Sequence, residues 1–335
     1  MRSNLSDTPF RARYASRLNS FASAPDLFWD GKTDKPDVAD LVKRAATVSG
    51  LTHLDLNYPD HAAGAGAETV RIARDNGLEI NGFAMRYYTD PGFKRGAFSN
   101  PDAAVRRKAI DLTKAGMDAA AAAGVNLMTI WLGQDGFDTP FQADYAQLWD
   151  WEVAGLREVA DHIPTMDVSV EYKPNEPRAF ALLPDATTTL LAIADAGSPN
   201  LGVTLDFAHM LYANEQPAYA AMLVAKRARV LGVHLNDGYA KRDDGLMVGA
   251  VHSLQTIELL RRIRADGYDG VIYFDTFPDF TGLDPVAECE ANIMVVESML
   301  DIIDRIDADN GLAAAVAAQD GIAAQRIVQQ CMFHR

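Results

Sequence analysis

Residues 168–206 read VSVEYKPNEPRAFALLPDATTTLLAIADAGSPNLGVTLD and contain one complete strand–helix–strand unit. The apolar run at 168–172 predicts a strand, residues 187–195 predict a helix that Gly197 ends, and residues 201–205 predict the next strand. A helix between two strands returns the chain to the same end of the sheet, so the strands are expected to be parallel. This segment therefore indicates an α/β fold.

The same unit repeats in both directions along the chain. Strands are expected at residues 20–28, 52–57, 78–85, 126–132, 168–172, 201–205, 230–235 and 271–274. Helices are expected at residues 37–48, 68–76, 102–123, 142–162, 187–195, 216–228, 253–265 and 285–306. Eight consecutive units in about 280 residues predict a closed (β/α)8 TIM barrel, and short apolar strands suit burial on both faces.

The two ends of the chain lie outside this series. Residues 1–19 would form a short N-terminal arm before the first strand. We expect a barrel domain at 1–307 and a C-terminal helical extension at 308–335, with a helix at 322–332. The extension either braces a neighbouring subunit or packs on its own barrel, and a homodimer or homotetramer is the expected assembly.

Composition narrows the class of protein. Hydrophobic residues make up 48% of the 335 residues, which is typical of globular proteins, and the formal net charge of −15 argues against nucleic acid and membranes as partners. Cys289 and Cys331 form no C-x-x-C motif, no secretory signal or apolar run of about 20 residues is present, and a cytoplasmic location is expected. The absence of G-x-G-x-x-G and P-loop motifs argues against a nucleotide cofactor.

Four potential metal ligands stand at the ends of four successive predicted strands. They are Glu171, Asp206, His234 and Asp275. Strand ends and the loops after them carry the active sites of such barrels. Each residue alone could be a loop cap or a core residue, but three carboxylates that face one space repel each other without a cation between them. The set predicts a divalent metal, Mn²⁺ first, with Mg²⁺, Co²⁺ or Zn²⁺ as alternatives.

The motifs around these ligands resemble those of the xylose isomerase-like barrels, a superfamily of sugar isomerases and epimerases. Residues 170–178, VEYKPNEPR, resemble the E-x-K-P-N-E-P-R stretch of that family, and residues 182–184 follow as LLP. DFAH at 206–209, HLN at 234–236 and YFD at 273–275 match the later ligand positions, with a further likeness to bacterial rhamnose isomerases. The likeness is strong over residues 169–278 and architectural before them.

The resemblance implies roles for three catalytic candidates. Lys173 would stabilise negative charge on the substrate carbonyl oxygen, with a salt bridge to a neighbouring acid as the alternative. His209 would reach a second metal, transfer a proton or orient a ligand. Asp243 matches the first acid of a D-x-D pair that holds the second metal in hydride-shifting isomerases. Residues 175, 176 and 178 are expected to be loop structure.

Two departures from the family leave the mechanism open. In the loop KRDDGL at 241–246, Gly245 stands where the second acid is expected, with Asp244 and Asp237 as substitutes. A hydride shift with two metals and an enediolate route with one both remain. The single-metal 3-epimerases use Glu at the first and last ligand positions, whereas here the last is Asp275, whose shorter side chain disfavours that reaction.

Three further residues at strand ends are substrate-binding candidates. Trp131 would stack on a sugar or pack in the core, and Asn57 ends the second strand. Arg86 would pair with an anionic substrate group or form a surface pair with an acid. No phosphate cradle is apparent, which favours a free sugar as the small-molecule partner.

The sequence thus predicts a metal-dependent sugar isomerase that interconverts an aldose and a ketose. A single-metal ketose 3-epimerase and a lyase acting on an oxidised sugar are the alternatives on the same site. A non-catalytic sugar-binding barrel is favoured only by Gly245.

Overall fold

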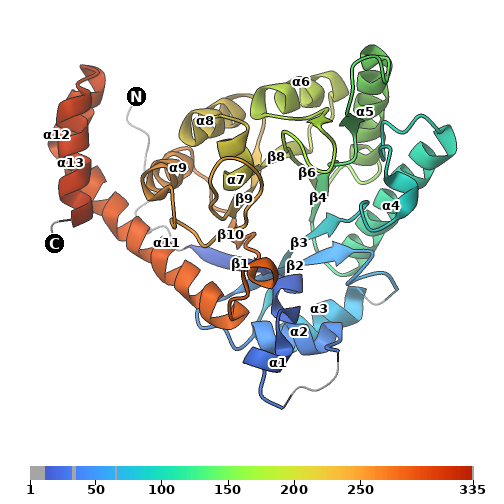
Figure 1. Cartoon of the computed structure of the whole chain (residues 1–335), viewed down its shortest axis with the longest axis horizontal. Coiled ribbons are helices and arrows are strands. Elements are labelled where there is room, and N and C mark those ends of the chain that lie inside the picture. Colours follow the sequence, from blue (N-terminus) through green and yellow to red (C-terminus); the bar gives the residue numbers. More distant parts are fainter. Residues whose placement is uncertain (1–11, 32–34, 65, 334–335) are drawn as a thin grey trace.

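The computed structural model describes residues 12–31, 35–64 and 66–333, and they form a closed barrel of parallel strands (Figure 1). Around the barrel the strands follow the order β1-β10-β9-β8-β6-β4-β3-β2. Their bounds are β1 Arg13–Arg17, β2 His53–Tyr58, β3 Glu79–Met85, β4 Leu127–Trp131, β6 Asp167–Glu171, β8 Leu201–Asp206, β9 Val230–Leu235 and β10 Val271–Phe274. The order matches the sequence order, as the repeated strand–helix units predict.

Helices surround the strands (Figure 1). The outer ring comprises α2 Val38–Ala45, α3 Gly66–Asp75, α4 Ala103–Ala122, α5 Tyr145–Ala160, α6 Ala186–Ala196, α8 Pro217–Arg227, α9 Ser253–Ala265 and α11 Pro285–Ala308. Each lies within a few residues of a predicted helix. The prediction of a (β/α)8 TIM barrel is therefore confirmed.

Local sequence explains where these elements begin and end. Asp185 caps α6 by accepting a hydrogen bond from Thr188 N at 2.7 Å, and Gly197 ends the helix with a left-handed φ of 72°. All six residues of β8 are buried, because the barrel core covers one face and helices cover the other.

The first strand is not where the sequence predicts it. The strand expected at residues 20–28 is wrong: Leu18–Ala22 form a 3-10 turn and Pro25–Phe28 the short helix α1. Instead β1 at Arg13–Arg17 closes the barrel by pairing with β10 and β2. Residues 13–19, expected in an N-terminal arm, thus belong to the barrel, whereas residues 1–11 lie outside the described part of the chain.

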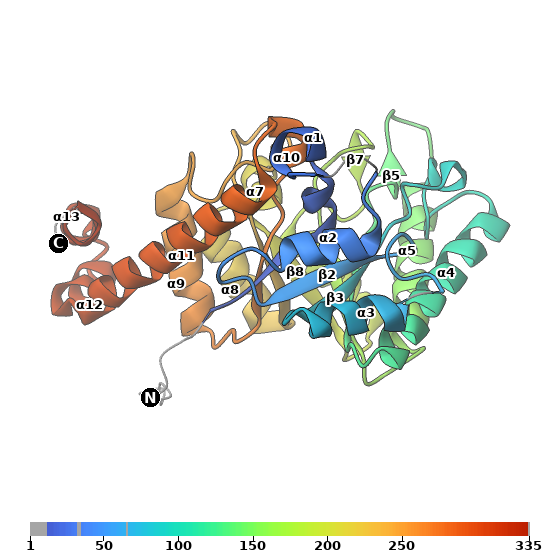
Figure 2. The ribbon, with the colours of Figure 1, turned by 90° about the horizontal axis from the view of Figure 1, so that it is seen from below.

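The C-terminal extension consists of two helices after α11. They are α12 at Asn310–Ala317 and α13 at Gly321–Phe333, the second of which matches the helix predicted at 322–332. Figure 2 shows both helices at the far end of α11, away from the barrel. Arg305 on α11 donates to the carbonyl of Cys331 at 2.9 Å, so α13 packs on α11 and not around the barrel.

Short elements cover the end of the barrel at which the strands terminate (Figure 2). They include α7 Phe207–Tyr212, α10 Pro278–Thr281 and a 3-10 turn, η2, at Pro91–Phe93. β5 Gly136–Phe137 pairs with β7 Phe180–Ala181, which ties the loop after β4 to the loop after β6. No described helix combines the length and apolar character needed to cross a membrane.

Candidate active site

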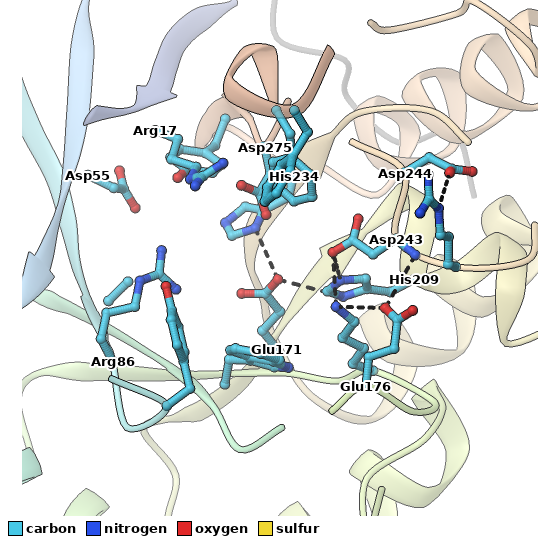
Figure 3. A pocket seen from close by; sticks show the side chains of 18 residues that line it. Arg17, Asp55, Arg86, Glu171, Glu176, His209, His234, Asp243, Asp244 and Asp275 are labelled. Atoms are coloured by element: carbon cyan, nitrogen blue, oxygen red, sulfur yellow. Dashed lines mark hydrogen bonds and ion pairs between the residues drawn. The ribbon is translucent and has the colours of Figure 1, made fainter. Parts of the chain in front are cut away.

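A cavity of about 470 Å³ lies at the carboxyl ends of the strands (Figure 3). Its lining is rich in ionisable side chains from almost every strand or the loop that follows it. The charged or titratable members are Arg17, Asp55, Arg86, Tyr88, Glu171, Lys173, Glu176, His209, His234, Arg242, Asp243, Asp244, Tyr273 and Asp275. Such a concentration of charge in a concave site is typical of catalysis or ion binding.

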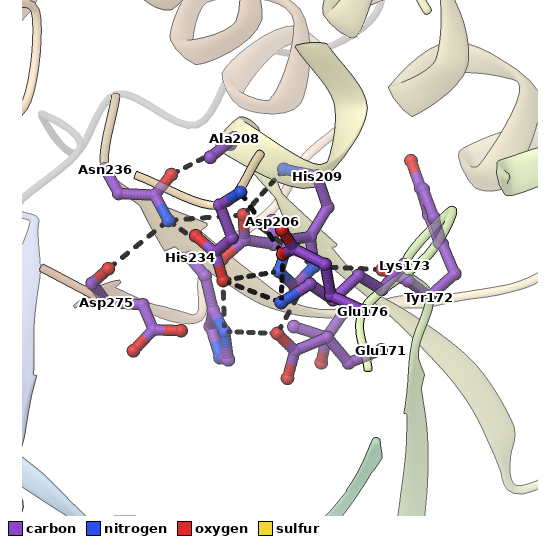
Figure 4. Close-up of polar contacts among 12 residues, drawn as sticks. Glu171, Tyr172, Lys173, Glu176, Asp206, Ala208, His209, His234, Asn236 and Asp275 are labelled. Carbon is purple, nitrogen blue, oxygen red and sulfur yellow. Dashed lines mark hydrogen bonds and ion pairs between the residues drawn. The ribbon is translucent and has the colours of Figure 1, made fainter. Parts of the chain in front are cut away.

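The four predicted ligands meet at one point (Figure 4), and three of them, Glu171, His234 and Asp275, line this cavity. Glu171 ends β6, Asp206 ends β8, His234 lies in β9 and Asp275 follows β10. Each offers one ligand atom, and these four atoms all lie within 4.8 Å of one another. The cluster has the size and the chemistry of a divalent-cation site.

The imidazole of His234 supports this interpretation. Its Nδ1 atom is buried and has no hydrogen-bond partner within the described chain. It lies 3.5 Å from Oε1 of Glu171 and 4.0 Å from Oδ2 of Asp206. A buried ring nitrogen normally has a partner, and a cation between these three groups would provide one.

Burial and mutual repulsion raise the pKa of two of the three carboxyl groups in the cluster. Burial, followed by repulsion from Asp243, Asp275 and Glu171, raises the pKa of Asp206 to about 7 against the pull of His209. Burial and Glu171 likewise raise the pKa of Asp275. For Glu171 itself, burial opposes ionisation, but His234 and His209 lower the pKa to about 2. A divalent cation would compensate all three carboxylates at once.

Asp206 is held in place by its neighbours. Asn236 Nδ2 lies 3.2 Å from both carboxylate oxygens, and the backbone N–H of His209 donates to Oδ1 at 3.0 Å (Figure 4). Asn236 in turn accepts from the N–H of Ala208 at 2.8 Å. Such supporting contacts fix the orientation of a metal ligand before the ion binds.

The three catalytic candidates form a second polar group beside the cluster. Oδ2 of Asp243 lies 3.0 Å from Lys173 Nζ and 3.2 Å from His209 Nε2. His209 Nδ1 lies 3.0 Å from the carbonyl oxygen of Tyr172, which fixes the ring, and 3.6 Å from Oε1 of Glu171. Lys173 thus forms the salt bridge that the sequence leaves as an alternative, and it also lines the cavity.

Both substitutes for a second metal-binding acid are engaged in other contacts. Asp237 is fully buried, and its oxygens accept from the N–H groups of Gly238, Val251 and His252. Asp244 lines the cavity, but its oxygens accept from Tyr239 N and Arg242 Nε at 2.8 and 2.7 Å.

Gly245 has no room for the missing acid. Its φ of +58° is left-handed, and an added Cβ would lie 2.2 Å from the ring of Phe277. The packing of Phe277 therefore opposes any side chain at position 245.

The three substrate-binding candidates have different surroundings. Trp131 lines the cavity with its ring centroid 5.1 Å from Lys173 Nζ, and Arg86 lines it from the end of β3. Asn57 is not among the lining residues, because its amide donates to Oδ1 of Asn19 at 3.0 Å. Conversely Glu176, expected to be loop structure, lines the cavity and lies 3.4 Å from Lys173.

Three lining residues are not predicted from the sequence, namely Arg17, Asp55 and Tyr273. Burial and nearby acids such as Asp275 raise the pKa of Asp55 to about 6, although Asn81 donates to its carboxylate at 2.9 Å. A strand places alternate residues inward, so the positions of Asp55 and Tyr273, two residues before Asn57 and Asp275, were a signal available in the sequence, whereas Arg17 ends a strand that the sequence does not predict.

A family model and curated relatives both relate this chain to xylose isomerases. The family model described as "Xylose isomerase-like TIM barrel" matches residues 44–297. The chain is 27% identical over 207 residues to the xylose isomerase of Thermus thermophilus, which covers 60% of this chain and 54% of that protein. It is 26% identical over 211 residues to the xylose isomerase of Thermus caldophilus, with coverage of 61% and 54%. The chain thus spans about half the length of these curated relatives.

Solved structures share the fold over more of the chain. A D-tagatose 3-epimerase-like protein superposes with a TM-score of 0.70 at 16% identity, covering 88% of this chain and 100% of the other. An L-ribulose 3-epimerase superposes with a TM-score of 0.68 at 18% identity, with coverage of 90% and 99%. At such identities the likeness concerns the fold.

Proposed function

Because the chain belongs to the family of xylose isomerase-like TIM barrels, we propose that it is a divalent-metal-dependent sugar isomerase that interconverts an aldose and a ketose. The observation that carries this proposal is the cluster of Glu171, Asp206, His234 and Asp275, three of which line one cavity together with Lys173. The curated relatives named xylose isomerase support it from sequence.

These four residues would hold the metal, Mn²⁺ first and Mg²⁺, Co²⁺ or Zn²⁺ otherwise. A bound divalent ion would supply Lewis acidity and a fixed alignment for two adjacent substrate oxygens. Asn236 keeps Asp206 in its orientation, and Glu171 is held ionised by the two histidines.

Lys173 and the Asp243–His209 pair would act on the substrate. The ammonium group of Lys173 stabilises the oxyanion that develops at the carbonyl oxygen, in a site where little water weakens the interaction. His209 Nε2 and Asp243 Oδ2 lie 3.2 Å apart, and in the enediolate route one member of this pair would take the proton from C2 of the aldose and return it to C1. Trp131 forms the apolar wall against which the sugar ring stacks.

A second candidate, ketose 3-epimerisation, is favoured by one observation. Within the described residues, Glu171, Asp206, His234 and Asp275 are the group of ligand atoms close enough to hold an ion, and Phe277 blocks an acid at position 245. A single-metal reaction by proton transfer needs no second site. The short side chain of Asp275 remains the argument against it.

Proton NMR in D2O separates these reactions. The protein is loaded with Mn²⁺, incubated with a panel of aldoses and ketoses, and freed of metal by a chelator before each spectrum. Conversion of an aldose to its ketose supports the isomerase, and solvent deuterium at C2 of the aldose identifies proton transfer. Deuterium at C3 of a ketose indicates the epimerase, and an unchanged panel contradicts both. Glu171→Gln, with metal content measured by mass spectrometry, is the inactive control.

We also propose a cytoplasmic homodimer or homotetramer. Helices α12 and α13 lie at the far end of α11, away from the barrel, and expose Val316, Ile322 and Phe333 (Figure 2). Light scattering coupled to gel filtration measures the mass directly. A monomer at micromolar concentration would contradict this assembly.

A further inference from the structure

Arg86 is a partly buried cation that forms no ion pair with the residues that the structure describes. It follows β3 and points into the cavity from the wall opposite His209 and Asp243 (Figure 3). Its Nε atom is buried and has no hydrogen-bond partner among the residues that the structure describes. The ion pairs that the described cavity-lining cations form involve Lys173, His209, His234, Arg242 and Arg17.

The acids near Arg86 are already engaged elsewhere. Asp55 on β2 accepts a hydrogen bond from Asn81, and Glu171 and Asp275 belong to the cluster of ligand atoms. The ring of Tyr88 lies 5.8 Å from the guanidinium carbon, which is a weak contact for a full charge. The guanidinium group therefore has hydrogen-bonding capacity that no carboxylate of the described chain uses directly, and an anionic ligand could use it.

A second arginine lines the same wall. Arg17 ends β1 and lies in register with Asp55 of β2, the strand that separates β1 from β3 and Arg86. Its ion-pair partner is Asp279 at 3.5 Å, and its guanidinium carbon lies 4.8 Å from the ring centroid of Phe277. Asp279 is 34% exposed, so this pair is weak and leaves the Arg17 charge available to the cavity.

We propose that the cavity selects acidic sugars, with the anionic group bound by Arg86 and assisted by Arg17. This inference rests on the proposed function, and it names the substrate class of that same site. A planar guanidinium matches a carboxylate or a phosphate with two parallel hydrogen bonds. The reacting oxygens would then lie toward Glu171 and His234, and the anionic end of the sugar would lie toward Arg86. A cavity of about 470 Å³ accommodates a monosaccharide of this kind.

Calorimetric titration of the Mn²⁺-loaded protein tests this selection without requiring turnover. The ligands are galacturonate with galactose, glucuronate with glucose, and glucose 6-phosphate. At least one acidic member should bind about tenfold or more tightly than its neutral counterpart. Whether a uronate or the sugar phosphate binds with higher affinity identifies which anionic group the site prefers.

Variants separate a direct contact from a general charge effect. Arg86→Gln should abolish the preference for the acidic sugar, and Arg86→Lys should retain part of it. Arg242→Gln removes a positive charge from the same cavity, but Arg242 is 72% exposed and paired with Asp244. This control should therefore leave the ratio of the two affinities within about twofold.

Thermal unfolding distinguishes a ligand-binding arginine from a structural one. Arg86 forms no ion pair with the described residues, so the Tm of ligand-free Arg86→Met should stay close to that of the wild type, whereas loss of a structural counter-charge would give a lower Tm. Neutral sugars that bind as tightly as acidic ones, in wild type and Arg86→Gln alike, would overturn this inference and leave the isomerase proposal standing. A metal-loaded protein that binds no sugar of either class would overturn both.

Discussion

Lys173 Nζ lies 3.0 Å from Oδ2 of Asp243, and both side chains are less than a tenth exposed. The ammonium group that would stabilise a substrate oxyanion is thus already paired in the ligand-free protein. A substrate oxygen must share or replace Asp243 as its partner. The pair keeps Lys173 charged and fixed in position, because burial alone would lower its pKa and the adjacent Asp243 raises it.

Replacement of Lys173 by Met should therefore affect the reaction and not the metal. We expect kcat to fall about 100- to 1000-fold, because a positioned charge next to the developing oxyanion is lost. Bound metal should stay at the wild-type level in mass spectrometry. Lys114→Met, which breaks a surface pair with Glu158, is the matched control. Loss of metal together with activity would show that Lys173 supports the metal site instead.

Replacement of Asn236 by Ala tests the support of the ligand cluster. The amide contacts both oxygens of Asp206, so its removal should weaken Mn²⁺ binding about 10- to 100-fold. Titration of the metal into apoprotein measures this directly. Asn76→Ala, at an exposed helix end, should leave the affinity unchanged. An unaltered Kd in Asn236→Ala would mean that Asp206 is oriented by the helix backbone alone.

Stability should depend on pH through Glu288, in the first turn of α11. Burial raises its pKa from 4.5 to about 7, although Thr276 donates to it. Below pH 4.5 the carboxyl group is protonated in both the folded and unfolded chain. Between pH 4.5 and 7 the unfolded chain ionises first, so the free energy of unfolding falls as pH rises.

Glu288→Gln removes this dependence. Urea unfolding should show a gain on the order of 2 kcal/mol for the variant at pH 8 and almost none at pH 4. Glu258→Gln, at an exposed position on α9, should show no such difference between the two pH values. A Glu288→Gln variant that is equally stabilised or destabilised at both pH values would contradict the assignment.

Introduction of the missing acid at position 245 should fail to create a second metal site. Gly245→Asp places a side chain in a left-handed conformation and against Phe277, and we expect a loss on the order of 2 kcal/mol or more. Gly77→Asp, with φ of +81° and open space around it, measures the conformational cost alone. Two equivalents of bound metal in Gly245→Asp would refute this expectation.

The sequence predicts the barrel well from β2 onward but fails at its first strand. Arg13–Arg17, RYASR, has little apolar character, whereas residues 20–28 contain Phe21, Leu27 and Phe28 and look more strand-like. The true strand forms because β10 and β2 offer hydrogen-bonding edges on both sides, which is a long-range effect. Local pattern cannot report a pairing between residues that lie about 250 positions apart.

In the candidate site too, local sequence pattern predicts some features, and others depend on contacts between distant parts of the chain. The four ligands follow apolar runs at recognisable spacing, so their meeting point could be anticipated. The sequence does not predict that Arg86 lacks an ion-pair partner, because that depends on which acids approach it from other strands. Asp55 and Arg17 become neighbours of the cavity only through the register of β1 with β2.

The contact between Gly245 and Phe277 also restricts the evolutionary routes open to this chain. An acid at 245 is harmful while the phenyl ring is present, and a smaller residue at 277 removes the ring that lies beside Arg17. A lineage that acquires a second metal must therefore accept the change at 277 first and the acid afterwards. Random single-substitution libraries would miss that path, whereas a paired library at 245 and 277 would include it.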